Sequence, residues 1–99
     1  MSASGFDFLY DHTEETRTRF VCFITPSLVR LDLAITTTSR FYGKTLVTDL
    51  QTGRTATVGP DDLNEEGRLE HMFRLNEEEG QALREFLYEV VGTINFTDI

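Results

Sequence analysis

The period of the apolar residues changes once along the chain, and this change constrains the fold more than any other feature. The first half alternates apolar and polar residues with a period of two, which is typical of half-buried strands. The second half repeats apolar residues at helical spacing, about every 3.6 residues. Strands therefore come first and helices follow. We expect one two-layer α+β domain over residues 1–99, with loosely ordered ends at 1–5 and 93–99.

A turn at Thr25-Pro26-Ser27-Leu28 joins the first two predicted strands, at about 17–25 and 28–37. Pro26 stands at the second turn position, where its fixed φ is favourable. We expect Ile24 to lie opposite Val29, because this pairing gathers apolar residues on one face of the hairpin. That face, the predicted core face, carries Phe20, Cys22, Ile24, Leu31, Leu33 and Ile35.

A second hairpin is predicted from the loop Gln51-Thr52-Gly53, with glycine in the left-handed conformation and Leu50 opposite Arg54. Its strands cover about 44–50 and 54–59. Together the two hairpins predict an antiparallel meander of about four strands. Pro60 ends the sheet, because proline has no amide hydrogen for the ladder.

Two helical segments follow the predicted sheet. A short helical stretch begins near Asp61 and is broken or bent near Gly67. The C-terminal helix is capped by Asn76, and Glu79 three residues later completes a capping box. Gly92 is its expected end. The apolar stripe of this amphipathic helix comprises Ala82, Leu83, Phe86, Leu87, Val90 and Val91, and we expect it to pack on the predicted core face.

The net charge of −8 comes entirely from residues 60–99, which hold three basic and eleven acidic residues. Such a surface repels phosphate backbones, so nucleic acid is an unfavoured partner. The longest apolar run, Phe20–Ile24, is far shorter than the roughly 20 residues that span a bilayer, so no membrane span is expected. One cysteine and the absence of a secretory signal favour a cytoplasmic protein.

Five short segments occur in an order that resembles a known family. They are Arg19–Phe23, Leu31–Ile35, Arg40–Val47, Asp61–Glu65 and Leu69–Phe73. Together they resemble a small family of cytosolic domains of unknown function from bacilli and related Gram-positive bacteria. The similarity covers about residues 17–90. It implies a small bacterial cytosolic domain and supplies no reaction, ligand or catalytic residue.

No catalytic or metal-binding arrangement stands out. Cys22 has apolar neighbours and is expected in the core, where a thiol is unreactive. His12 and His71 lack the spacing of metal ligands. Phosphate-binding glycine loops and nucleophile motifs are also missing from the sequence. We therefore expect no cofactor and no metal, and the sequence favours a non-enzymatic role.

The connection between the second and third strands holds one candidate site. Arg40 and Lys44 flank Phe41 and Tyr42, an arrangement that can hold a phosphate or stack on a base. The structural alternative is a connection whose aromatic residues pack against the sheet edge, with Gly43 supplying an unusual backbone angle.

The opposite face of the first hairpin is the second candidate. Under the predicted pairing it carries Phe23 and Arg30 side by side, with Arg19 farther along, and a cation–π contact between Arg30 and Phe23. This mixture is too apolar for a fully hydrated surface and indicates an interface. The apolar N-terminal residues could cover it, or a second copy in a homodimer could.

These features lead to three functional hypotheses. The first is a non-enzymatic protein-interaction or regulatory module that binds a protein partner or itself through the second sheet face or the connection at 40–44. The alternative is a binding domain or small enzyme for an anionic, phosphorylated metabolite, with Arg40, Tyr42, Lys44 and Arg19 as binders. An RNA-binding sheet is the third, opposed by the charge of −8.

Overall fold

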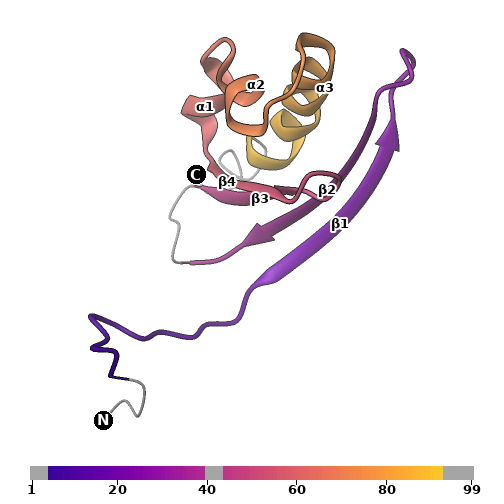
Figure 1. The fold of residues 1–99 in the computed structure, drawn as a ribbon. Helices are drawn as coiled ribbons and strands as arrows, with labels where there is room; N and C mark the ends of the chain where they lie inside the picture. The colour runs from indigo at the N-terminus through magenta and orange to yellow at the C-terminus, as the bar shows by residue number, and fades with distance from the viewer. Residues whose placement is uncertain (1–4, 40–43, 93–99) are drawn as a thin grey trace.

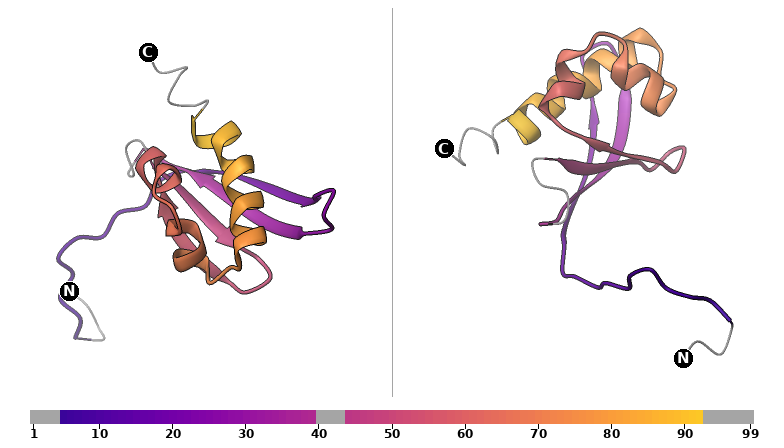
Figure 2. Two further views of the ribbon diagram at one scale, coloured as in Figure 1. Left: turned by 90° about the horizontal axis from the view of Figure 1, so that it is seen from above. Right: turned by 90° about the vertical axis from the view of Figure 1, so that its left-hand side faces the viewer.

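The computed structural model describes residues 5–39 and 44–92 and confirms the α+β meander (Figure 1). Its elements are β1 (Arg17–Ile24), β2 (Arg30–Thr37), β3 (Thr45–Asp49), β4 (Arg54–Val58), α1 (Pro60–Asn64), α2 (Arg68–Phe73), α3 (Glu77–Leu87) and η1 (Tyr88–Gly92). The strands form one antiparallel sheet in the order β1-β2-β3-β4. The helices all lie over one face of this sheet (Figure 2).

The hydrophobic core lies between the sheet and the helices. It is built from Leu31, Leu33, Ile35, Val47, Val58, Leu63, Leu69, Phe73, Ala82, Leu83 and Leu87, with Val29 at its border. Burial of each of the larger side chains contributes about 1.5–3 kcal/mol to the hydrophobic stabilisation. Ala82, Leu83 and Leu87 belong to the predicted stripe of α3, while Phe86 and Val90 are partly buried at the margin of the core.

The β1 strand pairs with β2 one residue away from the predicted register. Phe23 lies opposite Leu31 and Val21 opposite Leu33. Phe23 and Val21 therefore pack against the core, whereas Phe20 is 72% exposed and Ile24 is 62% exposed. Cys22 is also exposed. The predicted core face was correct for β2 and wrong for β1, because a one-residue shift exchanges the two faces of a strand.

The shift arises in the turn, where the loop is one residue longer than predicted. Thr25 pairs with Val29, since the Thr25 N–H donates to the Val29 carbonyl at 2.9 Å. The N–H of Leu28 donates to the Thr25 carbonyl at 2.8 Å, and Leu28 adopts the left-handed conformation with φ 69°. A non-glycine residue in this conformation costs about 1–2 kcal/mol, so this longer loop could not be expected from the turn residues.

The second hairpin is also one residue longer in its loop than predicted. Asp49, and not Leu50, lies opposite Arg54, and the Gly53 N–H donates to the Asp49 carbonyl at 2.7 Å. Gly53 has φ 81°, the left-handed conformation that the sequence predicted. As a result Val47 is buried under the helices, and Leu46 points to the other side of the sheet.

The helix boundaries follow the predicted signals. Pro60 begins α1, and Gly67, with φ 78°, separates α1 from α2. Asn76 Oδ1 accepts the Glu79 N–H at 2.8 Å, and Glu79 Oε1 accepts the Asn76 N–H at 3.0 Å. The capping box of α3 is therefore confirmed, and helical turns continue through η1 to Gly92.

Candidate interaction surface

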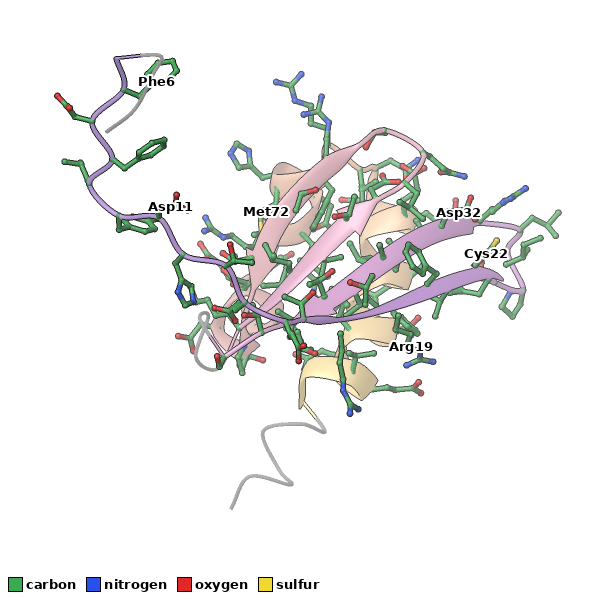
Figure 3. All side chains as sticks on the ribbon, turned by 90° about the horizontal axis from the view of Figure 1, so that it is seen from below. Phe6, Asp11, Arg19, Cys22, Asp32 and Met72 are labelled. Carbon is green, nitrogen blue, oxygen red and sulfur yellow. The ribbon has the colours of Figure 1, made fainter. Side chains whose placement is uncertain are left out.

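The sheet face opposite the helices has no helix over it in the described part of the chain (Figure 3). We call it the open face. It is formed by Thr18, Phe20, Cys22, Ile24, Arg30, Asp32, Ala34, Thr36, Leu46, Thr48, Thr55 and Thr57. These residues follow from the observed registers, because side chains that lie opposite each other in a ladder share a face.

The open face is largely uncharged. Phe20 and Ile24 expose apolar surface at its β1 side. Hydroxyl groups pair across the strands, with 2.9 Å between the Oγ1 atoms of Thr18 and Thr36 and 2.8 Å between those of Thr48 and Thr55. Depletion of charge is the compositional mark of interface centres. In a chain of net charge −8, a neutral face of this kind can approach another molecule with little repulsion.

The charged residues of the open face, Arg30 and Asp32, neutralise each other. The Nε of Arg30 donates to Asp32 Oδ2 at 3.1 Å, and the Nε2 of Gln51 donates to the same oxygen at 3.2 Å. Figure 3 shows Cys22 beside Asp32, its partner in the ladder. Arg30 is thus engaged with a carboxylate, and the predicted cation–π contact with Phe23 is wrong because Phe23 lies on the other face.

Hydrogen bonding sets the protonation of this small cluster. The hydrogen bond from the Cys22 thiol, together with those from Arg30 and Gln51, lowers the pKa of Asp32. The same bond to Asp32 raises the pKa of the Cys22 thiol above its ordinary value. Since the thiolate is the nucleophilic form, Cys22 is accessible but poorly activated at neutral pH. The expectation that Cys22 lies in the core was wrong.

The β1 strand is an edge strand, and its outer edge is long and regular. Its eight residues pair one-to-one with β2, without a bulge. Because the Thr25 amide points toward β2, the alternation of an antiparallel ladder directs the amides of Thr18, Phe20, Cys22 and Ile24 to the outer edge. A long edge of this kind is a template for an additional strand.

The helix side of β1 carries Arg19 and Phe23, which both contact α3. The Phe23 and Phe86 ring centroids are 5.0 Å apart, and the Arg19 guanidinium lies 5.7 Å from the Phe86 ring centroid. The cation–π contact of this region is therefore between Arg19 and Phe86. Arg17, also on this side, is exposed at the start of the strand.

The predicted site in the connection between β2 and β3 is only partly visible. Lys44 is exposed directly before β3. Arg40, Phe41 and Tyr42 lie outside the described residues, so their role stays a prediction. The structure does not bring Arg19, Arg30 and Lys44 together. Arg19 faces the helix side and Arg30 the open face, and Lys44 precedes β3 at the opposite end of the β2–β3 pair from Arg30.

Residues 5–16 form an extended N-terminal arm that leads away from the sheet (Figures 1 and 2). Its base is held by Glu14, whose carboxylate accepts hydrogen bonds from the hydroxyl groups of Thr38 and Ser39. Farther out it exposes four apolar residues to between 67% and 99%, namely Phe6, Phe8, Leu9 and Tyr10. In the sequence analysis these apolar residues are one possible cover for a face of the first hairpin. In the structure the arm extends beyond the sheet (Figure 3).

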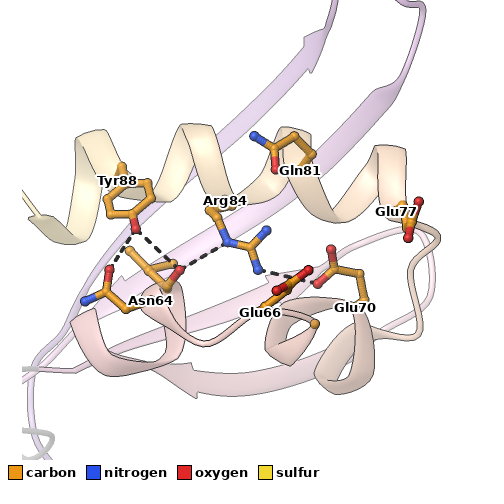
Figure 4. Close-up of a pocket in the computed structure, with 9 residues that line it drawn as sticks. Asn64, Glu66, Glu70, Glu77, Gln81, Arg84 and Tyr88 are labelled. Carbon is orange, nitrogen blue, oxygen red and sulfur yellow. Dashed lines mark hydrogen bonds and ion pairs between the residues drawn. The ribbon is translucent and has the colours of Figure 1, made fainter.

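A cleft of about 790 Å³ lies on the helical side, between α1, α2 and α3 (Figure 4). Arg84 Nε donates to the Leu63 carbonyl at 3.1 Å, and Arg84 Nη2 lies 3.5 Å from Glu70 Oε1. The Tyr88 hydroxyl donates to Asn64 Oδ1 at 2.8 Å. Arg84 and Tyr88 thus satisfy the C-terminal end of α1, which would otherwise leave carbonyl groups without donors. No sequence pattern had pointed to this network, which joins residues 21 and 24 positions apart.

The described residues form neither a cluster of metal ligands nor a membrane-spanning helix. Residues 5–39 and 44–92 contain no group of three or more histidine, cysteine or acidic residues that could hold a metal ion. His12 instead contacts Glu14 at 3.1 Å. The helices that the structure describes are all too short or too polar to cross a bilayer.

Comparison with known proteins identifies a family and no curated relative. The SAV0927-like family, whose members are small domains of unknown function, matches residues 9–89. This match covers all four strands, α1, α2 and α3. No curated protein matches the chain. Since the match spans most of the sequence, the chain belongs to the SAV0927-like family.

Proposed function

We propose that this chain is a non-enzymatic protein-interaction module that acts in the cytoplasm. Its docking surface is the outer edge of β1 together with the adjoining part of the open face. The observation that carries the proposal is the coincidence of an eight-residue unbulged edge with the exposed side chains of Phe20 and Ile24. The free, exposed thiol of Cys22 supports a reducing compartment.

The partner chemistry follows from the two sides of β1. A strand added to this edge would receive backbone hydrogen bonds from the outward amides of Thr18, Phe20, Cys22 and Ile24. Its apolar side chains would lie beside Phe20 and Ile24 on the open face. On the helix side it would meet the exposed guanidinium of Arg17 and that of Arg19, which favour acidic residues. The expected partner is therefore an extended segment with alternating apolar and acidic residues.

The non-enzymatic part of the proposal is supported by the state of the polar groups on the open face. Asp32 is engaged by Arg30 and Gln51, and the pKa of Cys22 is raised. A nucleophile would need the opposite shift, toward the thiolate. On the helical side, Arg84 and Tyr88 of the cleft are engaged with main-chain and side-chain groups of the same chain.

A photo-reactive amino acid at position 20 tests this function in the cells that produce the protein. We expect it to cross-link to one defined extended segment, mapped by mass spectrometry, with apolar residues at alternate positions. The matched control places the same amino acid at His71, which is exposed on the helical side, and should not give this product. Absence of a product at position 20, or the same products at both positions, would contradict the proposal.

A further inference from the structure

We infer that the segment which pairs with β1 is the N-terminal arm of a second copy of this chain. This inference rests on the proposed function and names its partner. Residues 6–13 of each copy would add to the β1 edge of the other, in an antiparallel ladder that places position 6 opposite 24 and position 13 opposite 17. The two-fold axis of this homodimer passes near Glu15.

The first support is length and continuity. The arm enters β1 directly, and it is extended in the structure (Figure 1). Residues 6–13 and β1 both contain eight residues, about 26 Å each at about 3.3 Å per residue. The arm of one copy therefore matches the edge of the other from end to end, and no turn has to form.

The second support is the distribution of side chains between the two faces. In this register Tyr10 lies opposite Phe20, and Phe6 lies opposite Ile24, all on the open face. The exposed aromatic rings of the arm would thus cover exposed apolar residues of β1. A shift of the arm by one residue would direct the rings to the helix side and lose this match.

The third support is charge. Asp7, Leu9 and Asp11 alternate with the aromatic residues of the arm, so they fall on the helix side of β1. There Asp11 lies opposite Arg19, and Leu9 lies opposite the partly buried Val21. Opposite charges in directly facing positions of a ladder stabilise the pairing. Asp11 therefore meets the basic start of β1, while Asp7 lies opposite Phe23 at the other end of the strand.

The structure also favours pairing of the arm with β1 of a second copy over pairing with β1 of its own chain. To pair with its own β1 the arm would have to reverse direction between about residues 12 and 16. At that point Glu14 accepts hydrogen bonds from Thr38 and Ser39, and the chain continues outward (Figure 2). Exchange across a two-fold axis keeps this anchored, extended path, and two-fold dimers are the commonest assemblies.

The single cysteine of the chain provides a direct test. In the inferred register Phe8 lies opposite Cys22 of the other copy, and facing Cα atoms are about 5.5 Å apart, which suits a disulfide. Phe8→Cys should therefore give a disulfide-linked dimer with oxidised glutathione, at least about tenfold more than the control Leu9→Cys. Leu9 is the neighbouring exposed arm residue, but it faces the helix side.

A second variant keeps Phe8 in place and controls for its loss. In a Cys22→Ser chain, Phe6→Cys with Ile24→Cys should give the same linked dimer. A disulfide within one chain would show that the arm covers its own edge and would overturn the inference. Failure of both variants to link would overturn it as well. The proposed function would survive either result if the cross-linker at position 20 captured a strand of another protein.

Discussion

Cys22 lies on the open face, and its pKa differs from that of an ordinary exposed thiol chiefly because of one neighbour. Asp32 lies opposite it in the ladder, and their hydrogen bond raises the pKa of the thiol. Arg30 acts in the opposite direction, but its influence is smaller. Cys22 was expected in the core because both faces of β1 carry apolar side chains, Phe20 on one face and Phe23 on the other. The residues of such a strand do not show which of its faces is buried.

Replacement of the carboxylate should therefore activate the thiol. In Asp32→Asn the pKa of Cys22 falls, because the hydrogen bond to the carboxylate and the negative charge of the carboxylate, which both disfavour the thiolate, are lost while Arg30 remains. The thiolate fraction at pH 8 rises, and we expect alkylation by iodoacetamide to become severalfold faster. The pH dependence of the alkylation rate should shift to lower pH.

Gln51→Ala is the matched control for Asp32→Asn. It removes a neutral donor to Asp32 and leaves the charge in place, so its alkylation rate should stay close to that of the unmodified chain. The chains are compared under conditions in which they have the same sedimentation coefficient. An unchanged or slower rate in Asp32→Asn would contradict the assigned cause of the pKa shift.

The elements of the fold were predictable to different degrees. Strand order, the capping box at Asn76 and the break at Gly67 follow from local signals, and each was confirmed. Both hairpin registers were wrong by one residue, because each loop is one residue longer than the shortest loop compatible with its turn residues. A register depends on loop length, and in the first hairpin the loop length depends on an unfavourable conformation of Leu28.

The error in the register of the first hairpin also made the prediction of the candidate site wrong. Its edge and open face could not be predicted, since they depend on which residues of β1 point away from the helices. Phe20 and Ile24 are surface residues because Val29 pairs with Thr25 and not with Ile24. The anchoring of Glu14 by Thr38 is a long-range contact with no local pattern, so the outward path of the arm was not predictable either.

Leu28→Gly tests the structure of the first turn. Leu28 is 82% exposed and has φ 69°, so its replacement loses little buried surface and removes the strain of a left-handed residue. We expect the free energy of unfolding to rise by about 0.5–1 kcal/mol, since the greater entropy of unfolded glycine offsets part of the gain. Urea denaturation measures this change.

The converse substitution in the second hairpin is the control for Leu28→Gly. Gly53 has the same left-handed conformation and open space around its Cα. Gly53→Ala should therefore lower the free energy of unfolding by about 1 kcal/mol through backbone strain alone. Destabilisation by Leu28→Gly would contradict the observed turn and would favour the predicted register, in which Ile24 lies opposite Val29.

At the scale of the whole molecule, the two faces of the sheet differ in their surroundings. Within residues 5–39 and 44–92, α1, α2 and α3 cover one face of the sheet, and the opposite, largely uncharged face has no helix over it and adjoins a long edge strand (Figure 2). In the sequence the charge of −8 comes from residues 60–99, the part of the chain that contains α1, α2 and α3. This asymmetry keeps repulsion away from the open face, which suits a module that associates through its sheet.

Amide hydrogen exchange of β1 in the full chain tests the docking edge most directly. The amides of Val21 and Phe23 point to β2 and should be protected in any state of the folded chain. If the edge is occupied by a strand, the outward amides of Phe20 and Cys22 should also exchange at least about tenfold more slowly than unprotected amides. Fast exchange of these two amides at all protein concentrations, beside slow exchange of Val21 and Phe23, would contradict an edge occupied by a second copy.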